Sequence, residues 1–318
     1  MIVTVTLNAA VDRSLTVPNF QRGQRHRASA GLTLAGGKGI NVARALKLLG
    51  VPVVATGFVG GAAGTRIVEE LTRESVLNDF VRIEDESRTS TAVIDPAGGT
   101  YTEINEWGPS VSEEELGILH EKLMYLTQGA EVVVFAGSLP RNVADEFYAE
   151  ATRDLARRHI PTVLDSEGEP LRLGIEAEPF LVSPNQREAE ALVGQEFHDE
   201  EDFRLALERI AELGARNVLI TTEAGCVARL REDREEPRFF RAVAPRLEAV
   251  SVVGAGDVLL AAFLAARHVG RSLEEALRAA VAAGAASTLE VGAGRFDPRQ
   301  AGRLQAGVQI VELAPVEA

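Results

Sequence analysis

The sequence has little of what several common kinds of site and fold require. Its 318 residues include one cysteine, Cys226, so no disulfide framework or cluster of thiolate metal ligands can form within it. The five histidines show no zinc-site spacing. No apolar run is long enough to cross a bilayer, because charged residues and glycine interrupt the alanine-rich C-terminal segments. We therefore expect no association with membranes and a reducing, cytoplasmic location.

Basic residues are also scarce. The 33 lysines and arginines face 47 acidic residues, which gives a net charge of −14. This balance argues against a nucleic-acid partner, which requires a basic face. A local site for an anionic ligand remains possible on an acidic protein. The opening "MIVTVTLNAA" has no basic stretch, so it predicts a strand and not a signal peptide.

Strand-like and helix-like segments alternate along the chain, which predicts an α/β fold with three αβα layers and a mainly parallel central sheet. The predicted strands are 2–7, 51–60, 131–137, 161–166, 179–185 and 217–222. The predicted helices are 39–50, 64–74, 112–126, 143–158, 185–194, 202–214, 255–268 and 272–288.

Two regions, 13–34 and 81–106, break this alternation and resemble short antiparallel strands. They predict a small β-sheet lid, inserted at two points over the main domain. Ordinary surface hairpins are the alternative. Because exposed apolar strands tend to pair, we expect a homodimer formed through the lid.

The stretch "VVGAGD" (252–257) runs from a glycine-rich turn into an apolar helix. The first N–H groups of a helix are unpaired and lie at the positive end of its dipole, so they can bind an anion. Gly254, Ala255 and Gly256 would hold a phosphoryl group, and Asp257 would accept a proton beside it. A plain glycine turn with Asp257 as a helix cap is the alternative.

A second glycine-rich stretch, "LAGGKGINVARALKLLG", also precedes a helix. It matches the dinucleotide-binding fingerprint poorly and is not a phosphate-binding loop of the Walker type. The lysine, the asparagine and the backbone N–H groups favour a site that binds hydroxyl groups and a phosphate. The residues concerned are Gly37, Lys38, Gly39 and Asn41.

Together, "AGGKGINVARALKLLG" and "VVGAGDVLLAAF" resemble the two signatures of the ribokinase-like (PfkB) carbohydrate kinases. The resemblance continues through "TLNAAVDRS", "GSLP", "LDSEGEPL" and "SPNQREAE", so it implies one kinase domain over 1–318. "TLNAAVD" and "SRTS" (87–90) resemble the branch that phosphorylates ketohexose phosphates. The implied reaction converts fructose 1-phosphate to fructose 1,6-bisphosphate. Tagatose 6-phosphate and fructose 6-phosphate are alternative substrates.

The resemblance also implies roles for individual residues, with ATP and Mg²⁺ as cofactors. Asp257 would be the base, with Gly254, Ala255 and Gly256 as the anion hole. The sugar would contact Asp12, Gly37, Lys38, Gly39, Asn41 and Ser138. Arg25, Arg27 and Arg88 would come from the lid to hold the existing phosphate, a role that suits guanidinium groups, although solvated surface arginines are the alternative. Asn185 and Glu188 would organise magnesium through water, unless Glu188 is a surface acid of its helix. Thr221 and Gly225 would contact the nucleotide.

Two features depart from the family pattern. Ser183 stands where many members have lysine, and "TTEAGC" (221–226) replaces a longer loop with more glycines. By analogy, 281–288 would flank the adenine. The altered loop keeps open a non-catalytic sugar-phosphate sensor, although a pure binder has no need of Asp257. An NAD-dependent enzyme would depend on the glycines alone.

Overall fold

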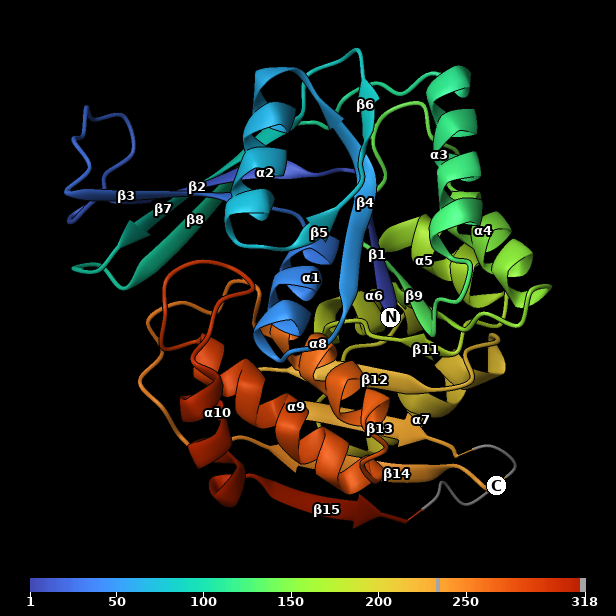
Figure 1. Cartoon of the computed structure of the whole chain (residues 1–318). Coiled ribbons are helices and arrows are strands. Elements are labelled where there is room, and N and C mark those ends of the chain that lie inside the picture. Colours follow the sequence, from blue (N-terminus) through green and yellow to red (C-terminus); the bar gives the residue numbers. More distant parts are fainter. Residues whose placement is uncertain (233–234, 315–318) are drawn as a thin grey trace.

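The computed structural model describes residues 1–232 and 235–314, which are organised around one large central sheet (Figure 1). Within these residues the sheet has 11 strands, in the order β15-β14-β13-β12-β11-β10-β9-β1-β4-β5, with β6 paired to β4. The parallel strands are β1 (Ile2–Thr6), β4 (Val53–Gly60), β5 (Leu77–Asn78), β6 (Val81–Ile83), β9 (Val132–Ala136), β10 (Thr162–Asp165), β11 (Leu181–Val182) and β12 (Val218–Thr222). The predicted mainly parallel sheet is confirmed.

One end of the sheet is antiparallel and was not assigned from the sequence. β13 (Gly225–Leu230), β14 (Arg238–Val243) and β15 (Gln309–Leu313) extend it from β12. The strand β12 turns into β13 through two residues, 223 and 224. The short connection explains the antiparallel direction, because a parallel neighbour requires a longer crossover.

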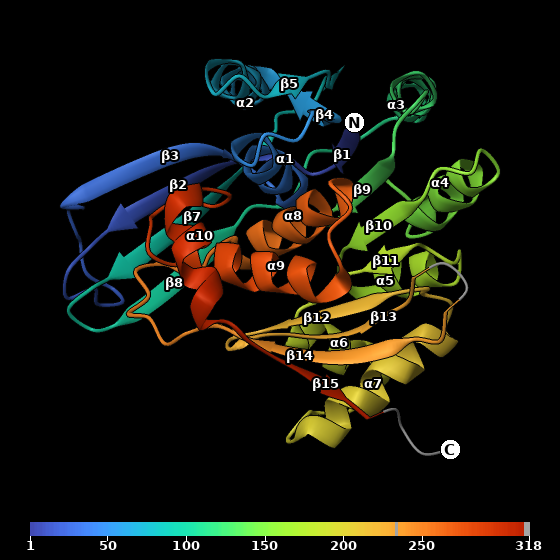
Figure 2. The same cartoon turned by 60° about the horizontal axis from the view of Figure 1, so that its bottom comes forward.

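Helices cover both faces of the sheet, so the molecule has the three predicted layers (Figure 2). One apolar core lies under α1 (Lys38–Leu48), α2 (Gly61–Arg73), α8 (Ala255–His268), α9 (Leu273–Ser287) and α10 (Pro298–Leu304). The other lies under α3 (Glu113–Leu126), α4 (Phe147–Ala156), α5 (Gly168–Ile175), α6 (Gln186–Val193) and α7 (Glu200–Glu212). A short 3₁₀ turn, Gln305–Gly307, follows α10. None of the helices in the described ranges combines the length and the apolar character needed to cross a membrane.

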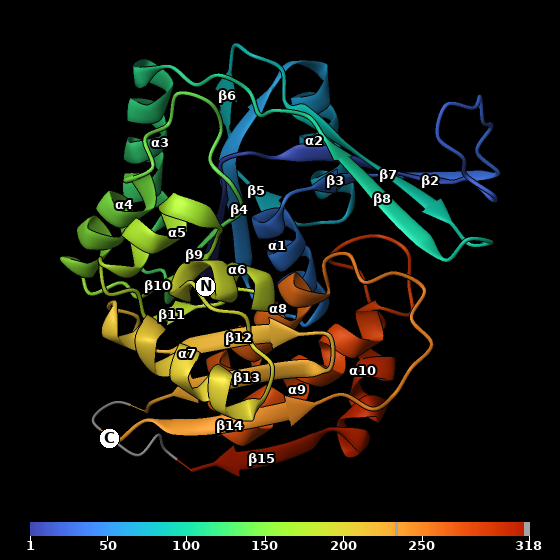
Figure 3. The same ribbon diagram turned by 180° about the vertical axis from the view of Figure 1, so that it is seen from behind.

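A second, four-stranded sheet projects from one side of the molecule (Figures 1 and 3). Its order is β3-β2-β7-β8, with β2 (Ala10–Thr16), β3 (Ala30–Gly36), β7 (Arg88–Asp95) and β8 (Thr100–Asn105). Each of the two regions contains an antiparallel pair, as expected, β2 with β3 and β7 with β8. β2 also pairs with β7 in parallel, which joins the two pairs into one sheet. The segment Val81–Ile83 belongs to the main sheet instead.

Candidate active site

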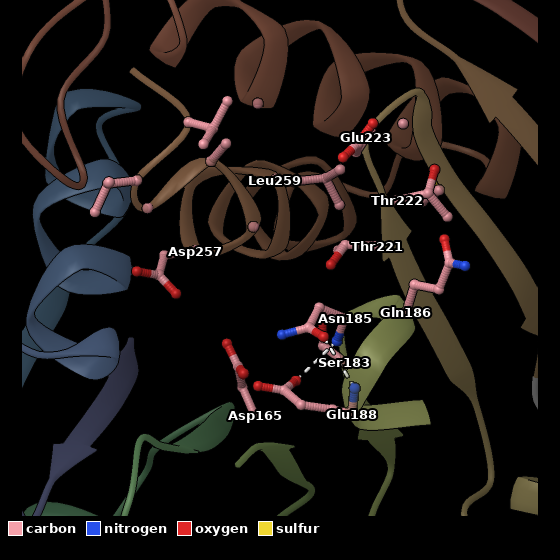
Figure 4. A pocket seen from close by; sticks show the side chains of 18 of the residues that line it. Asp165, Ser183, Asn185, Gln186, Glu188, Thr221, Thr222, Glu223, Asp257 and Leu259 are labelled. Carbon is pink, nitrogen blue, oxygen red and sulfur yellow. Dashed lines mark hydrogen bonds between the residues drawn. The ribbon is translucent and has the colours of Figure 1, made fainter. Parts of the chain in front are cut away.

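A cavity of about 1700 Å³ lies where the carboxyl ends of the parallel strands face the small sheet and the start of α8. This edge is the usual position of ligand sites in open α/β sheets. Figure 4 shows its middle, with Asp257, Asp165 and Glu188 grouped together and Thr222, Gln186 and Glu223 farther along. Thr221 lies between these groups.

The turn that begins α8 presents free backbone N–H groups to this cavity. Gly254 is the N-cap and has a left-handed backbone, with φ of 77°. A Cβ there would also come within 2.8 Å of Ala293, so glycine is required. The Ala255 N–H donates to the Val252 carbonyl at 3.3 Å. Within the part of the chain that the structure describes, the N–H groups of Gly254, Gly256 and Asp257 have no protein acceptor, so they are available to an anion.

The Asp257 side chain lies at the mouth of this turn, beside the free N–H groups. It lines the cavity although it is only 6% exposed. Asn41 Nδ2 donates a hydrogen bond to its Oδ2 at 2.7 Å. Burial raises the pKa of Asp257 well above its ordinary value, and the nearby Asp165 raises it further. A carboxylate with a raised pKa is a stronger base, which suits proton abstraction from a hydroxyl group.

Lys38 lies among acidic side chains at the same end of the cavity. Its Nζ donates to Asp165 Oδ1 at 2.8 Å and to Glu188 Oε1 at 3.0 Å. Burial acts to lower the pKa of Lys38, but these carboxylates outweigh it and the pKa is raised. The ammonium group is therefore held between two acids and stays charged. With Asp257, three carboxyl groups surround one ammonium, so this end can attract a divalent cation with its phosphates.

Asn185 and Glu188 form a capping box at the start of α6. Asn185 Oδ1 accepts from the Glu188 N–H at 3.0 Å, and Glu188 Oε2 accepts from the Asn185 N–H at 2.8 Å. Residues 1–232 and 235–314 contain no group of three or more side chains able to hold a metal ion alone. This arrangement fits magnesium held mainly by nucleotide phosphates and water, with the carboxylates in the outer shell.

The side of the cavity next to the small sheet carries polar groups suited to a sugar phosphate. Asp12 and Arg88 come from paired strands, β2 and β7. Burial raises the pKa of Asp12 to about 6, although Arg88 opposes the shift. Ser138 accepts from Asn8 Nδ2 at 3.1 Å, while Asn8 Oδ1 is buried without a partner in the described structure. These groups can bind several hydroxyls and an anion together.

The opposite side is less polar. Leu259, Val281, Gly284, Ala285 and Thr288 line it, which suits a flat apolar ring. Thr221 and Gly225 both line the cavity beside the hairpin of β12 and β13. A Cβ at Gly225 would come within 2.2 Å of the Ala242 carbonyl, so the neighbouring strand explains this glycine without a ligand.

Three predicted residues lie away from the cavity lining. Arg25 and Arg27 are exposed in the loop between β2 and β3. Gly39 is buried inside α1, where a Cβ would come within 2.4 Å of Thr6 Oγ1, so it permits close packing against β1. The neighbouring Gly37 and Lys38 do line the cavity, and Ser183 does so from the end of β11.

The model of the pfkB family carbohydrate kinases matches residues 3–300, which is most of the chain. The chain belongs to this family. It is therefore a carbohydrate kinase, and the family implies ATP as its phosphoryl donor.

Named relatives of this carbohydrate kinase cover nearly its whole length. A 1-phosphofructokinase of Bacillus subtilis is 35% identical over 298 residues, which is 93% of this chain and 96% of that protein. A tagatose-6-phosphate kinase of Staphylococcus epidermidis is 28% identical over 317 residues, 98% of this chain and 100% of that protein. The crystal structure of phosphofructokinase-2 from Escherichia coli with substrates and products superposes with a TM-score of 0.88 at 31% identity, covering 96% of this chain and 98% of that one.

Among the polar residues of the kinase cavity that were not predicted from the sequence are Asp165 and Asn8. Asp165 is the last residue of β10 and Asn8 lies just after β1, where parallel strands deliver side chains to a common site. The predicted strands, together with the rule that ligand sites lie at the carboxyl ends of parallel strands, would have identified both residues as candidates.

Proposed function

We propose that this kinase transfers the γ-phosphoryl group of ATP to a ketohexose phosphate, most specifically converting fructose 1-phosphate to fructose 1,6-bisphosphate. The observation that carries the proposal is a buried carboxyl group, Asp257, beside unpaired N–H groups in one cavity. The 1-phosphofructokinase name of the relative with 35% identity supports the choice of substrate. Tagatose 6-phosphate and fructose 6-phosphate are the alternatives.

In the proposed reaction, the free primary hydroxyl of the sugar attacks the γ-phosphorus. The new O–P bond forms as the bond to the leaving ADP oxygen breaks, and the hydroxyl proton passes to the Asp257 carboxylate. The N–H groups of Gly254 and Gly256 donate to the oxygens of the moving phosphoryl group, with Ala255 as the linking residue of this anion hole. Such preformed donors stabilise the charge that develops in the transition state.

The acidic end of the cavity would serve the nucleotide phosphates. Mg²⁺ would neutralise phosphate charge there, held through water by Asn185 and Glu188 with Asp165 nearby. Lys38 keeps these carboxylates apart and ordered, as its two ion pairs indicate. Thr221 and Gly225 would border the phosphates and the nucleoside.

The small sheet would act as a lid that carries the sugar-recognition groups. Asp12, Asn41 and Ser138 would accept or donate to hydroxyls, and Arg88 would pair with the existing phosphate. When the sheet approaches the main domain it would exclude water, which otherwise would hydrolyse ATP. Arg25 and Arg27 stay predictions, because their loop does not reach this chain's own cavity.

The substrate assignment is tested with a panel of sugar phosphates in a coupled assay of ADP release. We expect the highest kcat/KM with fructose 1-phosphate. A higher value with tagatose 6-phosphate or fructose 6-phosphate would replace the substrate, and the kinase assignment would stand. Calorimetric binding of a sugar phosphate with no ATP binding and no ADP release would instead favour the sensor.

We also propose that two copies associate through the small sheet and work in the cytoplasm. β8 is exposed along its length, and Tyr101, Ile104 and the nearby Trp107 leave large apolar side chains in solvent. Light scattering that gives the mass of one chain would contradict the dimer.

A further inference from the structure

Arg44 is a buried arginine that does not line the cavity. It lies on α1, six residues after Lys38 and three after Asn41, so all three lie on one side of the helix. Its side chain is almost fully buried, with 3% of the residue exposed. Burying a guanidinium group is costly unless its donors are satisfied, so its partners indicate what it does.

Three acceptors from separate segments fix the plane of this guanidinium group. Nε donates to Glu74 Oε2 at 2.7 Å, just after α2. Nη2 donates to the Ala35 carbonyl at 2.9 Å in β3, and Nη1 donates to the Ala293 carbonyl at 3.0 Å. Glu74 is held in turn by Arg295 Nη2 at 2.8 Å. The group therefore has little freedom to rotate.

The remaining contact of Arg44 is with Asn41. Nη1 donates to Asn41 Oδ1 at 3.3 Å. An arginine has donors and no acceptor, so only the oxygen of the amide can face it. The Asn41 NH₂ group then faces the other way, where it donates to Asp257. With the amide reversed, an oxygen would face the carboxylate oxygen and the hydrogen bond would be lost.

The Asn41 backbone is also confined. A Cβ at Gly294 would come within 2.8 Å of the Asn41 Cα, so the chain after Ala293 packs directly against it. With the backbone confined, the side-chain amide of Asn41 can still rotate, and the contact with Arg44 prevents that rotation. The hydrogen bond to Asp257 follows from the contact with Arg44, and not from the α1 backbone alone.

We propose that Arg44 is a positioning residue that holds the Asn41 amide in the orientation that binds Asp257. It acts through Asn41 and touches neither substrate. This inference rests on the proposed role of Asp257 as the base. It gives a role to a residue of the first glycine-rich signature that does not line the cavity.

The test compares Arg44→Met with Glu74→Gln. Both variants break the same buried ion pair, so both lower the unfolding temperature. Only Arg44→Met frees the Asn41 amide. We expect kcat to fall about 10- to 100-fold in Arg44→Met, as for misplaced catalytic groups, and to stay within about threefold in Glu74→Gln. The Kd of ADP stays within about threefold in both, because neither residue lines the cavity.

Two further measurements exclude a merely structural effect. In the Asn41→Ala background, Arg44→Met should lower kcat by no more than about threefold, because residues that act through one another are not additive. Loss of the Asn41 donor raises the pKa of Asp257, so the acid limb of the kcat profile moves to higher pH in Arg44→Met. Asp165, Asp12 and Lys38, which also act on this carboxyl group, stay in place in these variants, and loss of the Arg44 charge also raises the pKa of Asp12.

A loss in Glu74→Gln equal to that in Arg44→Met, or full multiplication with Asn41→Ala, would overturn the proposal. If Arg44→Met does not fold, Arg44→Gln replaces it, because a glutamine amide can turn either a donor or an acceptor toward Asn41 and so does not fix its orientation. Wild-type kcat in Arg44→Gln combined with an unshifted pH profile would then refute the proposal. An active Asp257→Asn variant would refute the base itself, which separates failure of the proposed function from failure of this inference.

Discussion

Replacing Asp257 with asparagine should separate the activity of the enzyme from its stability. Asparagine has nearly the same shape and can still accept the hydrogen bond from Asn41 Nδ2. The free N–H groups of Gly254 and Gly256 remain. The variant therefore lacks the proton acceptor and little else.

The expected loss follows from this single missing function. General-base catalysis contributes about 10²- to 10⁴-fold, so kcat should fall about 10³-fold, which corresponds to about 4 kcal/mol in the activation barrier. The KM for ATP should stay within about threefold, because the phosphate-binding groups are unchanged. The assay is steady-state ADP release with fructose 1-phosphate.

Stability should change in the opposite direction. The pKa of Asp257 is higher in the folded protein than its ordinary value of 3.8, so the folded state binds this proton more tightly. The stability due to that proton is present below pH 3.8 and is lost as the pH rises through the folded-state pKa. At neutral pH the uncharged asparagine avoids this loss, so the variant should unfold at a higher temperature than the wild type. The difference should shrink as the pH is lowered toward about 4.

The matched control is Asp297→Asn at the start of α10. Asp297 caps that helix through a hydrogen bond from the Arg299 N–H, and asparagine caps helices equally well. Its kcat should equal that of the wild type. A kcat for Asp257→Asn within about tenfold of the wild type would refute the assignment of the base.

Three further predictions concern other parts of the cavity. Gly254→Ala should lower the free energy of unfolding by about 2 kcal/mol in denaturant titrations, because of its left-handed backbone. At Gly256 a Cβ would have no neighbour closer than 3.6 Å, so Gly256→Ala should unfold like the wild type. It should still lose most of its kcat, because the methyl group enters the anion site. Loss of stability in both glycine variants, or an unchanged kcat in both, would contradict this prediction. Arg88→Ala should raise the KM for the sugar phosphate about 10- to 100-fold with little change in kcat. Arg13 is exposed on the neighbouring strand, so Arg13→Ala should leave this KM unchanged. The same KM in the two variants would show that Arg88 does not bind the sugar phosphate. Because Asp12 has a pKa raised to about 6, the KM for the sugar phosphate should rise as the pH falls through 6, and a similar rise in Asp12→Asn would show that another group titrates.

The parts of this molecule that sequence could predict are those with local signals. The helix after the glycine turn was expected over 255–268, and α8 has these bounds. The glycine turn and the apolar run after it determine both its start and its burial. The carboxyl groups of Asp165 and Asp257 carry no such signal of proximity, because they interact across the fold. The same is true of Lys38, which meets Asp165 across 127 positions of sequence.

Other features escaped prediction because they depend on packing between distant segments. The antiparallel direction of β13 follows from the two-residue turn after β12, which lies in the stretch 221–226 that resembled an altered binding loop. Gly225 resembled a ligand-binding glycine, although the adjacent β14 is sufficient to require it. Arg44 looked like any polar residue of an amphipathic helix, and only its four acceptors distinguish it.

The parallel pairing of β2 with β7 has a consequence for how the enzyme handles its sugar. Ala10 lies opposite Arg88, and Asp12 lies opposite Ser90, in a ladder that joins the two hairpins into one plate. A movement of the small sheet as one unit would therefore leave the separation of Asp12 and Arg88 unchanged. With the roles proposed above, the spacing between the hydroxyl contact and the phosphate contact would be fixed, and such a movement would change only the distance of both groups from the ATP.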